Sequence, residues 1–239
     1  MKVMITGSEG FICGYLVENL LSNGHSVVGI DNFSKYGEIR RSYADHSNYT
    51  FVNGNVCDTE LLKEHLHDCD HLVASAAKIG GISYFHEYAY DLMAENERIM
   101  ASTFDAAIDA FKNHKLKKIT VLSSSMVYEN TNKYPTPEGD QLLSPPPFST
   151  YGFQKLAAEY FAKGAWEQYK LPFTIARPFN CIGIGEGRAL GDVEIKSGNV
   201  KLAMSHVVPD IIQKIIKGQD PLHILGCLLY TSDAADDDH

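Results

Sequence analysis

Short apolar runs alternate with helical patterns along most of this sequence, and that alternation constrains the fold more than any other feature. The runs are typical of strands buried in a parallel sheet, and they cover residues 2–6, 26–31, 49–52, 71–78, 117–122 and 171–178. Helical patterns cover residues 15–21, 59–67, 91–111 and 207–217. Because parallel strands need crossover connections, this order predicts an α/β fold with a doubly wound parallel sheet.

The first run leads directly into a glycine turn and a helix. Gly7 and Gly10 follow the run at 2–6, and the helical pattern starts at Tyr15. Such a turn lets a pyrophosphate approach the backbone, and the amino terminus of the helix favours its charge. The second run ends in Asp31, an acid that can accept hydrogen bonds from a ribose diol and would repel a 2′-phosphate. We therefore predict a dinucleotide site that prefers NAD to NADP.

Cys13 stands where the dinucleotide fingerprint has its third glycine. That glycine normally allows close packing between helix and strand. We expect the thiol to crowd this contact and to weaken cofactor binding, and the adjacent Gly14, which has no side chain, to leave some room.

Residues 149–155 place a tyrosine and a lysine one helical turn apart. This stretch follows the turn-forming run 144–147 and leads into good helix formers at 156–160. Tyr151 and Lys155 therefore share a helix face. We expect the Lys155 ammonium to lower the pKa of Tyr151 toward useful proton transfer. The alternative is a pair of ordinary helix-surface residues, because Tyr-x-x-x-Lys is common by chance.

The overall composition argues against several kinds of partner. With a net charge of -9, we expect no binding to nucleic acid or to anionic membranes. The apolar runs are far shorter than a membrane span, and no signal-like segment opens the chain. The five cysteines have no metal-ligand spacing. We therefore expect no metal site, reduced thiols and a cytoplasmic location.

Several motifs together resemble the extended short-chain dehydrogenase/reductases of the NAD-dependent nucleotide-sugar epimerase/dehydratase family. They are Thr-Gly-x-x-Gly-Phe-Ile from residue 6, Ile-Asp-Asn from 30, Gly-Asn-Val from 54, Ala-Ala from 76, Ser-Ser-Ser-Met-Val-Tyr from 123, Tyr-x-x-x-Lys from 151 and Arg-Pro-Phe-Asn from 177. The resemblance covers residues 1–226. It implies a Rossmann-type NAD-binding domain with the catalytic residues over 1–180, and the start of a truncated nucleotide-sugar lobe over 181–226.

The resemblance also implies which residues form the site. The cofactor contacts that it implies are Gly7, Gly10, Phe11, Ile12, Asp31, Asn32, Asn55, Val56, Ala76, Ala77, Lys78, Tyr151, Lys155 and Phe179. Asn55 stands where the family usually has Asp. Ser124 would bond the reacting sugar oxygen, Tyr151 would carry the proton, and Lys155 would hold the nicotinamide ribose. The implied substrate contacts are Asn96, Ser125, Asn180 and His206.

Some of these residues have structural alternatives. Ser123 and Ser125 could be strand-end hydroxyls that bond backbone. Phe179 could be a core aromatic, and His206 could be a structural hydrogen-bonder.

The residues that follow Ser124 narrow the reaction implied by the resemblance. A 4,6-dehydratase typically has an acid pair there, whereas this chain has Ser125 and Met126, so dehydration is disfavoured. Residues 76–82 and 205–209 resemble segments of GDP-fucose synthases, in which a cysteine partners the histidine matched by His206. Met126 replaces that cysteine, which disfavours 3,5-epimerisation.

What remains is NAD-dependent 4-epimerisation of a UDP-hexose through a transient 4-keto sugar. A GDP-sugar epimerase/reductase and a non-catalytic NAD-binding regulator are the alternatives.

The end of the sequence departs from the family. Residues 222–226 predict a strand, but residues 227–239 look like a translated sequencing adapter joined to a truncated gene. We expect that tail to be no part of the fold, and apolar surface to be exposed where the rest of the lobe would pack. The family often dimerises through the helices that carry Asn96 and Tyr151, so a homodimer is an expectation from the resemblance.

Overall fold

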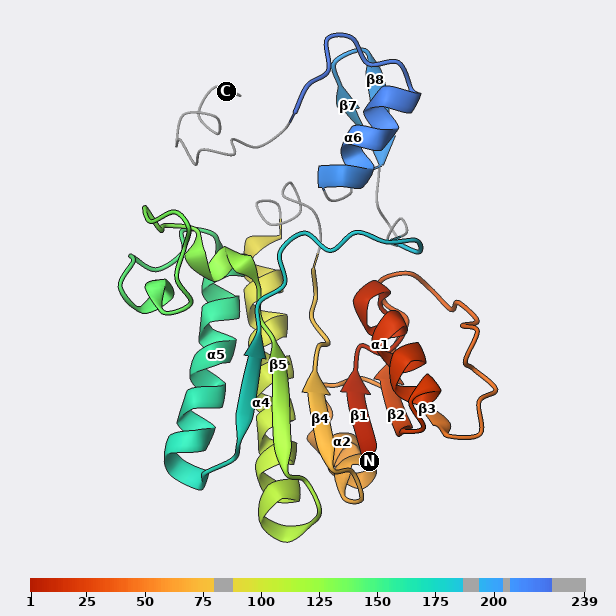
Figure 1. Ribbon diagram of the computed structural model, residues 1–239, viewed down its shortest axis with the longest axis vertical. Coiled ribbons are helices and arrows are strands. Elements are labelled where there is room, and N and C mark those ends of the chain that lie inside the picture. Colours follow the sequence, from red (N-terminus) through yellow and green to blue (C-terminus); the bar gives the residue numbers. More distant parts are fainter. Residues whose placement is uncertain (80–87, 187–193, 204–206, 225–239) are drawn as a thin grey trace.

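A six-stranded parallel sheet forms the centre of the computed structural model (Figure 1), which describes residues 1–79, 88–186, 194–203 and 207–224. The strand order is β3-β2-β1-β4-β5-β6. The strands are β1 (Lys2–Thr6), β2 (Ser26–Asp31), β3 (Tyr49–Asn53), β4 (His71–Ala74), β5 (Lys118–Leu122) and β6 (Phe173–Ala176). All neighbouring pairs are parallel, which confirms the predicted sheet. The order reverses between β1 and β4, where open α/β sheets bind ligands.

Alternating side chains along β1 contribute to two separate cores. Val3 and Ile5 pack with buried residues of α1 (Phe11–Ser22) on one face of the sheet. Met4 packs on the opposite face, which is covered by α2 (Thr59–Leu66), α4 (Ala89–Asn113) and α5 (Thr150–Tyr169). Figure 1 shows α1 on the other side of the sheet from α2 and α4. Residues buried on both faces explain why the strands read as continuous apolar runs.

Side-chain caps fix the starts of two helices. Asp58 accepts hydrogen bonds from the backbone N–H groups of Glu60 and Leu61 at the start of α2. Ser149 accepts one from Gly152 at 3.0 Å, which sets the first turn of α5. In contrast, α1 starts after Gly10 without any side-chain cap. The first N–H groups of α1 are therefore left available to a ligand.

The structure departs from the sequence predictions in three segments. Leu222–Ile224 is not a strand, because Gln219 rather than a neighbouring strand binds this backbone, with Gln219 Oε1 accepting from His223 N at 2.9 Å. β7 (Glu194–Ser197) pairs antiparallel with β8 (Val200–Ala203) near α6 (Val207–Ile216), and neither strand is among the apolar runs that predict the sheet. Two short 3₁₀ helices, η1 (Ser125–Tyr128) and η2 (Asp140–Leu142), follow β5. The predicted adapter-like tail lies outside the described residues.

Every helix in the described part of the chain is too short or too polar to cross a bilayer.

Candidate functional site

The glycine turn after β1 packs against the chain that leaves β4. Gly7 has a φ of +73°, and a Cβ built on it would lie 3.0 Å from the Cα of Ala76. Thr6 Oγ1 accepts from the N–H groups of Ser75 and Ala76, both at 3.1 Å. Gly10 N donates to Gly7 O at 3.1 Å. The turn is therefore a tight backbone cradle that ends at the uncapped start of α1, where Phe11 is half-buried and Ile12 is exposed.

Asp31 lies at the end of β2, beside this turn. Its Oδ2 accepts from Glu9 N at 3.0 Å, and its Oδ1 accepts from Phe33 N at 2.8 Å. An ionised carboxylate has about four acceptor positions, so two remain for a ribose diol. The position expected for the adenosine ribose is thus built from Asp31 and the glycine turn together.

The other residues expected near the adenosine occupy the turns after β2 and β3. Asn32 is exposed and its Oδ1 accepts from Ser34 N at 3.0 Å. Asn55 is also exposed, and its Oδ1 accepts from Cys57 N at 2.9 Å. Val56 is buried, and its carbonyl accepts from Ser102 Oγ.

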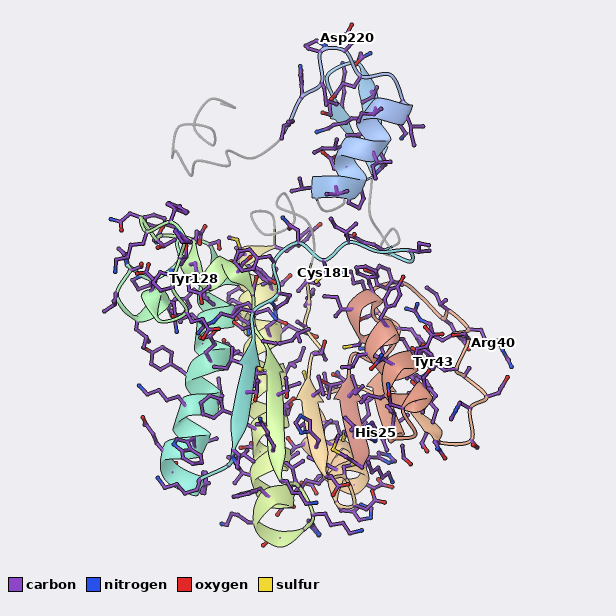
Figure 2. The ribbon with its side chains drawn as sticks, in the orientation of Figure 1. His25, Arg40, Tyr43, Tyr128, Cys181 and Asp220 are labelled. Atoms are coloured by element: carbon purple, nitrogen blue, oxygen red, sulfur yellow. The ribbon has the colours of Figure 1, made fainter. Side chains whose placement is uncertain are left out.

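A buried polar cluster that the sequence did not predict holds the glycine turn from outside. Arg41 Nη2 donates to Glu9 O, and its Nε lies 3.6 Å from Glu9 Oε2. Tyr49 donates to Glu9 Oε1 at 2.7 Å, and Tyr43, seen beside α1 in Figure 2, donates to Ser8 O at 3.3 Å. Burial raises the pKa of Glu9. Glu9 was the signal in the sequence that could have revealed this cluster. An acid inside a turn that is expected to bind pyrophosphate needs a nearby cation to offset its negative charge.

Cys13 is buried between α1 and β4. Its Sγ donates a hydrogen bond to Ser75 Oγ at 2.9 Å. Burial raises the pKa of Cys13 to about 11. Weaker cofactor binding stays a prediction.

The structure brings Ser124 and Tyr151 together. Ser124 follows β5, is 7% exposed, and accepts from Met126 N at 3.2 Å as the cap of η1. Tyr151 lies in the first turn of α5, and the Ser124 side chain hydrogen-bonds it. A strand end and a helix start that are 27 residues apart in sequence thus meet in one polar pair.

Lys155 lies one turn further along α5 and is buried. Its Nζ donates to Leu122 O at 3.0 Å and is 5.8 Å from the centroid of the Tyr151 ring. Burial lowers the pKa of Lys155 to about 8. The alternative of ordinary surface residues is therefore wrong for Lys155, which is 7% exposed.

The predicted lowering of the Tyr151 pKa by Lys155 is also wrong. Burial raises the pKa of Tyr151, and the hydrogen bond with Ser124 is the contribution that lowers it. The physical reason is that removing water disfavours the phenolate more than the nearby hydrogen bond favours it.

Asn96, expected to contact substrate, instead holds the backbone that follows β4. Its Oδ1 accepts from Lys78 N at 2.7 Å, and its Nδ2 donates to Lys78 O at 2.9 Å. The side chain is 1% exposed, and both its amide oxygen and its amide nitrogen bind the Lys78 backbone. Asn96 therefore fixes the path of the segment with Ala76, Ala77 and Lys78, all half-buried at the sheet edge.

The strand-end serines have different roles. The expectation that the Ser123 hydroxyl bonds backbone is wrong, because Ser123 Oγ donates to the carboxylate of Glu159 at 2.6 Å. Ser125 is half-buried in η1, and its backbone N donates to Pro178 O at 3.1 Å.

The residues expected around the substrate after β6 are open to solvent. Phe179 is 70% exposed, so the core-aromatic alternative is wrong. It lines a hollow of about 550 Å³ together with Tyr128 and Arg177. Asn180 is exposed, and His206 lies outside the described residues.

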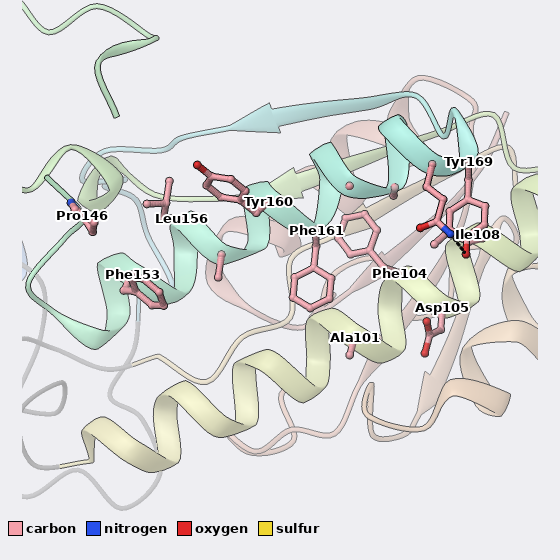
Figure 3. A pocket seen from close by; sticks show the side chains of 14 residues that line it. Ala101, Phe104, Asp105, Ile108, Pro146, Phe153, Leu156, Tyr160, Phe161 and Tyr169 are labelled. Carbon is pink, nitrogen blue, oxygen red and sulfur yellow. Dashed lines mark hydrogen bonds between the residues drawn. The ribbon is translucent and has the colours of Figure 1, made fainter. Parts of the chain in front are cut away.

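A separate apolar hollow lies between α4 and α5 (Figure 3). Its volume is about 720 Å³, and none of Ser124, Tyr151 and Lys155 lines it. Phe104 and Phe161 stack there with ring centroids 5.8 Å apart. In the part of the chain that the structure describes, no group of three His, Cys, Asp or Glu side chains could hold a metal ion.

Comparison with known proteins gives one family and several solved relatives. Residues 3–236 match the family described as "NAD dependent epimerase/dehydratase family". A UDP-glucose 4-epimerase of Halalkalibacterium halodurans is 27% identical over 240 residues, which cover 98% of this chain and 65% of that protein.

Two solved structures share the fold at 28% identity. The UDP-N-acetylglucosamine 4-epimerase from Methanobrevibacter ruminantium M1, in complex with UDP-N-acetylmuramic acid, aligns with a TM-score of 0.73 over 92% of this chain and 64% of its own. The UDP-glucuronic acid 4-epimerase from Bacillus cereus, in complex with UDP-glucuronic acid and NAD, aligns with a TM-score of 0.63 over 74% and 56%. The chain thus spans 65%, 64% and 56% of the lengths of these three relatives.

Proposed function

The chain belongs to the NAD dependent epimerase/dehydratase family, and we propose that it is an NAD-dependent 4-epimerase of a UDP-hexose. The observation that carries the proposal is the hydrogen-bonded pair of Ser124 and Tyr151 beside the buried Lys155. Epimerisation at C4 needs a single proton carrier, and Tyr151 supplies one. Dehydration would need further acid and base groups next to Ser124, and Met126 cannot exchange protons. The two solved relatives described above are 4-epimerases of UDP-sugars.

The glycine turn fits a dinucleotide. A Cβ on Gly7 would press on Ala76 at 3.0 Å from its Cα, and the first N–H groups of α1 have no side-chain cap. Under this proposal Gly7 and Gly10 hold the pyrophosphate, Asp31 accepts from the adenosine ribose, and Lys155 holds the nicotinamide ribose. When bound, NAD supplies the hydride acceptor and a positively charged ring.

Tyr151 moves the proton in this mechanism. Its oxygen would take the proton of the sugar 4-hydroxyl as a hydride leaves C4 for bound NAD. It would return that proton when the same hydride goes back to the opposite face of C4, after the keto sugar has turned in the site. Burial raises the pKa of Tyr151, and the hydrogen bond with Ser124 is the contribution that lowers it and so favours the phenolate. The Lys155 pKa of about 8 leaves this side chain largely protonated at pH 7, and under this proposal it donates from that state to the nicotinamide ribose.

Product analysis with alternative sugars tests the proposal. The protein is incubated with NAD and, separately, with UDP-glucose, UDP-galactose and GDP-mannose, while bound NADH is followed by absorbance. We expect interconversion of the two UDP-sugars and transient NADH. Tyr151→Phe should reduce the rate by about 10²- to 10⁴-fold. Tyr90→Phe is the control, because Tyr90 is an exposed tyrosine on α4, and it should leave the rate unchanged. Turnover of the GDP-sugar alone, loss of water from the sugar, or absence of NADH with every sugar would contradict the proposal.

We propose in addition that a second copy of the chain covers the hollow between α4 and α5. The hollow is lined by exposed aromatic rings, including Phe153 at 44% and Tyr160 at 54% exposure. Light scattering tests this proposal. Phe153→Asp should give a monomer, whereas Phe148→Asp, an exposed aromatic that does not line the hollow, should not. A monomeric parent protein would contradict it.

A further inference from the structure

A buried ion pair joins Glu159 of α5 to Arg177, the residue that follows β6. Arg177 Nε is 2.7 Å from Glu159 Oε1, and Arg177 Nη2 is 2.7 Å from Glu159 Oε2. The two side chains are 15% and 6% exposed, respectively. Both carboxylate oxygens thus receive parallel N–H bonds, a geometry that fixes orientation as well as distance.

The Glu159 carboxylate also binds the residue next to Ser124. Ser123 Oγ donates to Glu159 Oε1 at 2.6 Å, and the backbone N of Ser123 donates to Ala176 O at 2.8 Å. On the other side of Ser124, Ser125 N donates to Pro178 O at 3.1 Å. The backbone that carries Ser124 is therefore held on both sides by groups that adjoin Arg177 or the ion pair itself.

The same ion pair fixes the rotation of α5. Tyr151, Lys155 and Glu159 are spaced four residues apart, so they lie along one face of the helix. A helix whose Glu159 carboxylate is held at both oxygens cannot turn about its axis without breaking those bonds. Arg177 also donates to the Tyr128 hydroxyl at the end of η1 and to Glu138 O at 2.7 Å. One guanidinium therefore joins the helix that carries Tyr151 to the turn that starts at Ser124.

A buried ion pair is a poor source of stability, because the cost of removing two charges from water offsets their attraction. Apolar residues of similar size often serve the fold equally well. Retaining such a pair on the helix that carries Tyr151 is better explained by geometry. Resting on the proposed function, we infer that Glu159 and Arg177 are positioning residues that set the contact between Ser124 and Tyr151.

The test replaces the whole ion pair with apolar residues. The double variant Glu159→Leu/Arg177→Met is compared with Lys163→Met/Glu167→Leu, which removes an exposed pair 3.9 Å apart on the same helix. We expect the first double variant to keep its urea midpoint while kcat falls about 10- to 100-fold, with KM changed far less. Losing the Ser124 hydrogen bond raises the pKa of Tyr151, so the rising limb of the pH–rate profile moves to higher pH. The control pair should change none of these.

A crystal structure of the same double variant separates this inference from the proposed function. Loss of the Ser124–Tyr151 contact with the fold intact supports the positioning role even when no sugar is turned over. A wild-type kcat, a rising limb of the pH–rate profile that stays in place, or an unchanged Ser124–Tyr151 contact would overturn the positioning role.

Should the double variant fail to fold, Arg177→Lys keeps the charge but not the parallel pair of bonds. For that variant a lower kcat with a shifted pH limb supports the role, and unchanged values overturn it. Absence of turnover in the parent protein would count against the proposed function alone.

Discussion

Replacing Lys155 with methionine should make the protein more stable at neutral pH while removing its activity. Lys155 is buried, and its Nζ donates to the carbonyl of Leu122 rather than to a carboxylate. Burial lowers its pKa from 10.5 to about 8. At pH 7 that displacement corresponds to about 3 kcal/mol of destabilisation by the buried charge. Loss of the hydrogen bond to Leu122 removes about 1 kcal/mol, so Lys155→Met should gain about 2 kcal/mol.

The sign of the pH dependence follows from the protons bound in each state. Between about pH 8 and pH 10.5 the unfolded chain keeps the Lys155 proton and the folded chain has lost it. Unfolding therefore takes up a proton, and the wild-type protein gains stability as the pH rises through this window. The advantage of Lys155→Met, about 2 kcal/mol at pH 7, should accordingly fall to about zero at pH 10.

Urea unfolding at pH 7 and at pH 10 measures this difference. Lys163→Met is the control, because Lys163 lies on the same helix with a side chain 55% exposed. It should change the free energy of unfolding by less than about 0.5 kcal/mol at both pH values. A Lys155→Met protein that is less stable than wild type at pH 7 would refute the reasoning. An advantage that is equal at the two pH values would also refute it.

Three further predictions concern the glycine turn, the β4 segment and the thiols. Gly7→Ala should destabilise the fold and weaken NAD binding measured by titration calorimetry, because it combines a positive φ with the Ala76 contact. Gly24→Ala, with a similar φ and open space around it, should lose about 1 kcal/mol and leave NAD binding unchanged. Asn96→Ala removes both bonds to the Lys78 backbone and should lower the free energy of unfolding by about 2 kcal/mol. Asn113→Ala, an exposed control on the same helix, should change the free energy of unfolding little. Equal effects of the two substitutions would contradict the stabilising role of the Asn96 bonds to Lys78. In peptide mapping after alkylation of the native protein, the exposed Cys181 should be labelled and Cys13 should stay unlabelled until unfolding, because Cys13 is buried and its pKa is raised to about 11.

The sheet and the reacting residues could be predicted because their signals are local in the sequence. A parallel strand buried on both faces is a continuous apolar run, and the turn at Gly7 follows such a run directly. Tyr151 and Lys155 are one helical turn apart, so a pattern of five residues suffices to pair them.

The polar groups around the site could not be predicted, because each joins segments that are distant in sequence. Arg41 reaches Glu9 across 32 residues, and Arg177 reaches Glu159 across 18. Charged residues are usually exposed, so a pattern of charges gives no sign that these four are partly or fully buried. The pKa of Tyr151 was predicted with the wrong sign for a related reason. Spacing along α5 reveals the nearby cation but not the loss of water, and burial is the larger effect.

The ion pair with Arg177 also keeps the Glu159 carboxylate from pairing with Lys155, although Glu159 is the acid nearest to Lys155 in the sequence of α5. Glu159 follows Lys155 by four residues, a spacing at which a lysine and a glutamate readily pair. In the structure both Glu159 oxygens bind Arg177, and burial is the cause that lowers the pKa of Lys155. Arg177→Met should release the Glu159 carboxylate toward Lys155. Attraction between the two charges would then raise the pKa of Lys155.

A pair of stability measurements isolates this effect from the general damage done by Arg177→Met. Lys155→Met is introduced into the wild-type protein and into the Arg177→Met protein, and the change in the free energy of unfolding is measured at pH 7 and pH 10. In the wild-type background the change should fall with pH, as argued above. In the Arg177→Met background it should be nearly flat, because Lys155 then titrates near its unfolded value and no proton is taken up on unfolding. The same pH dependence in both backgrounds would show that Arg177 does not keep Glu159 away from Lys155.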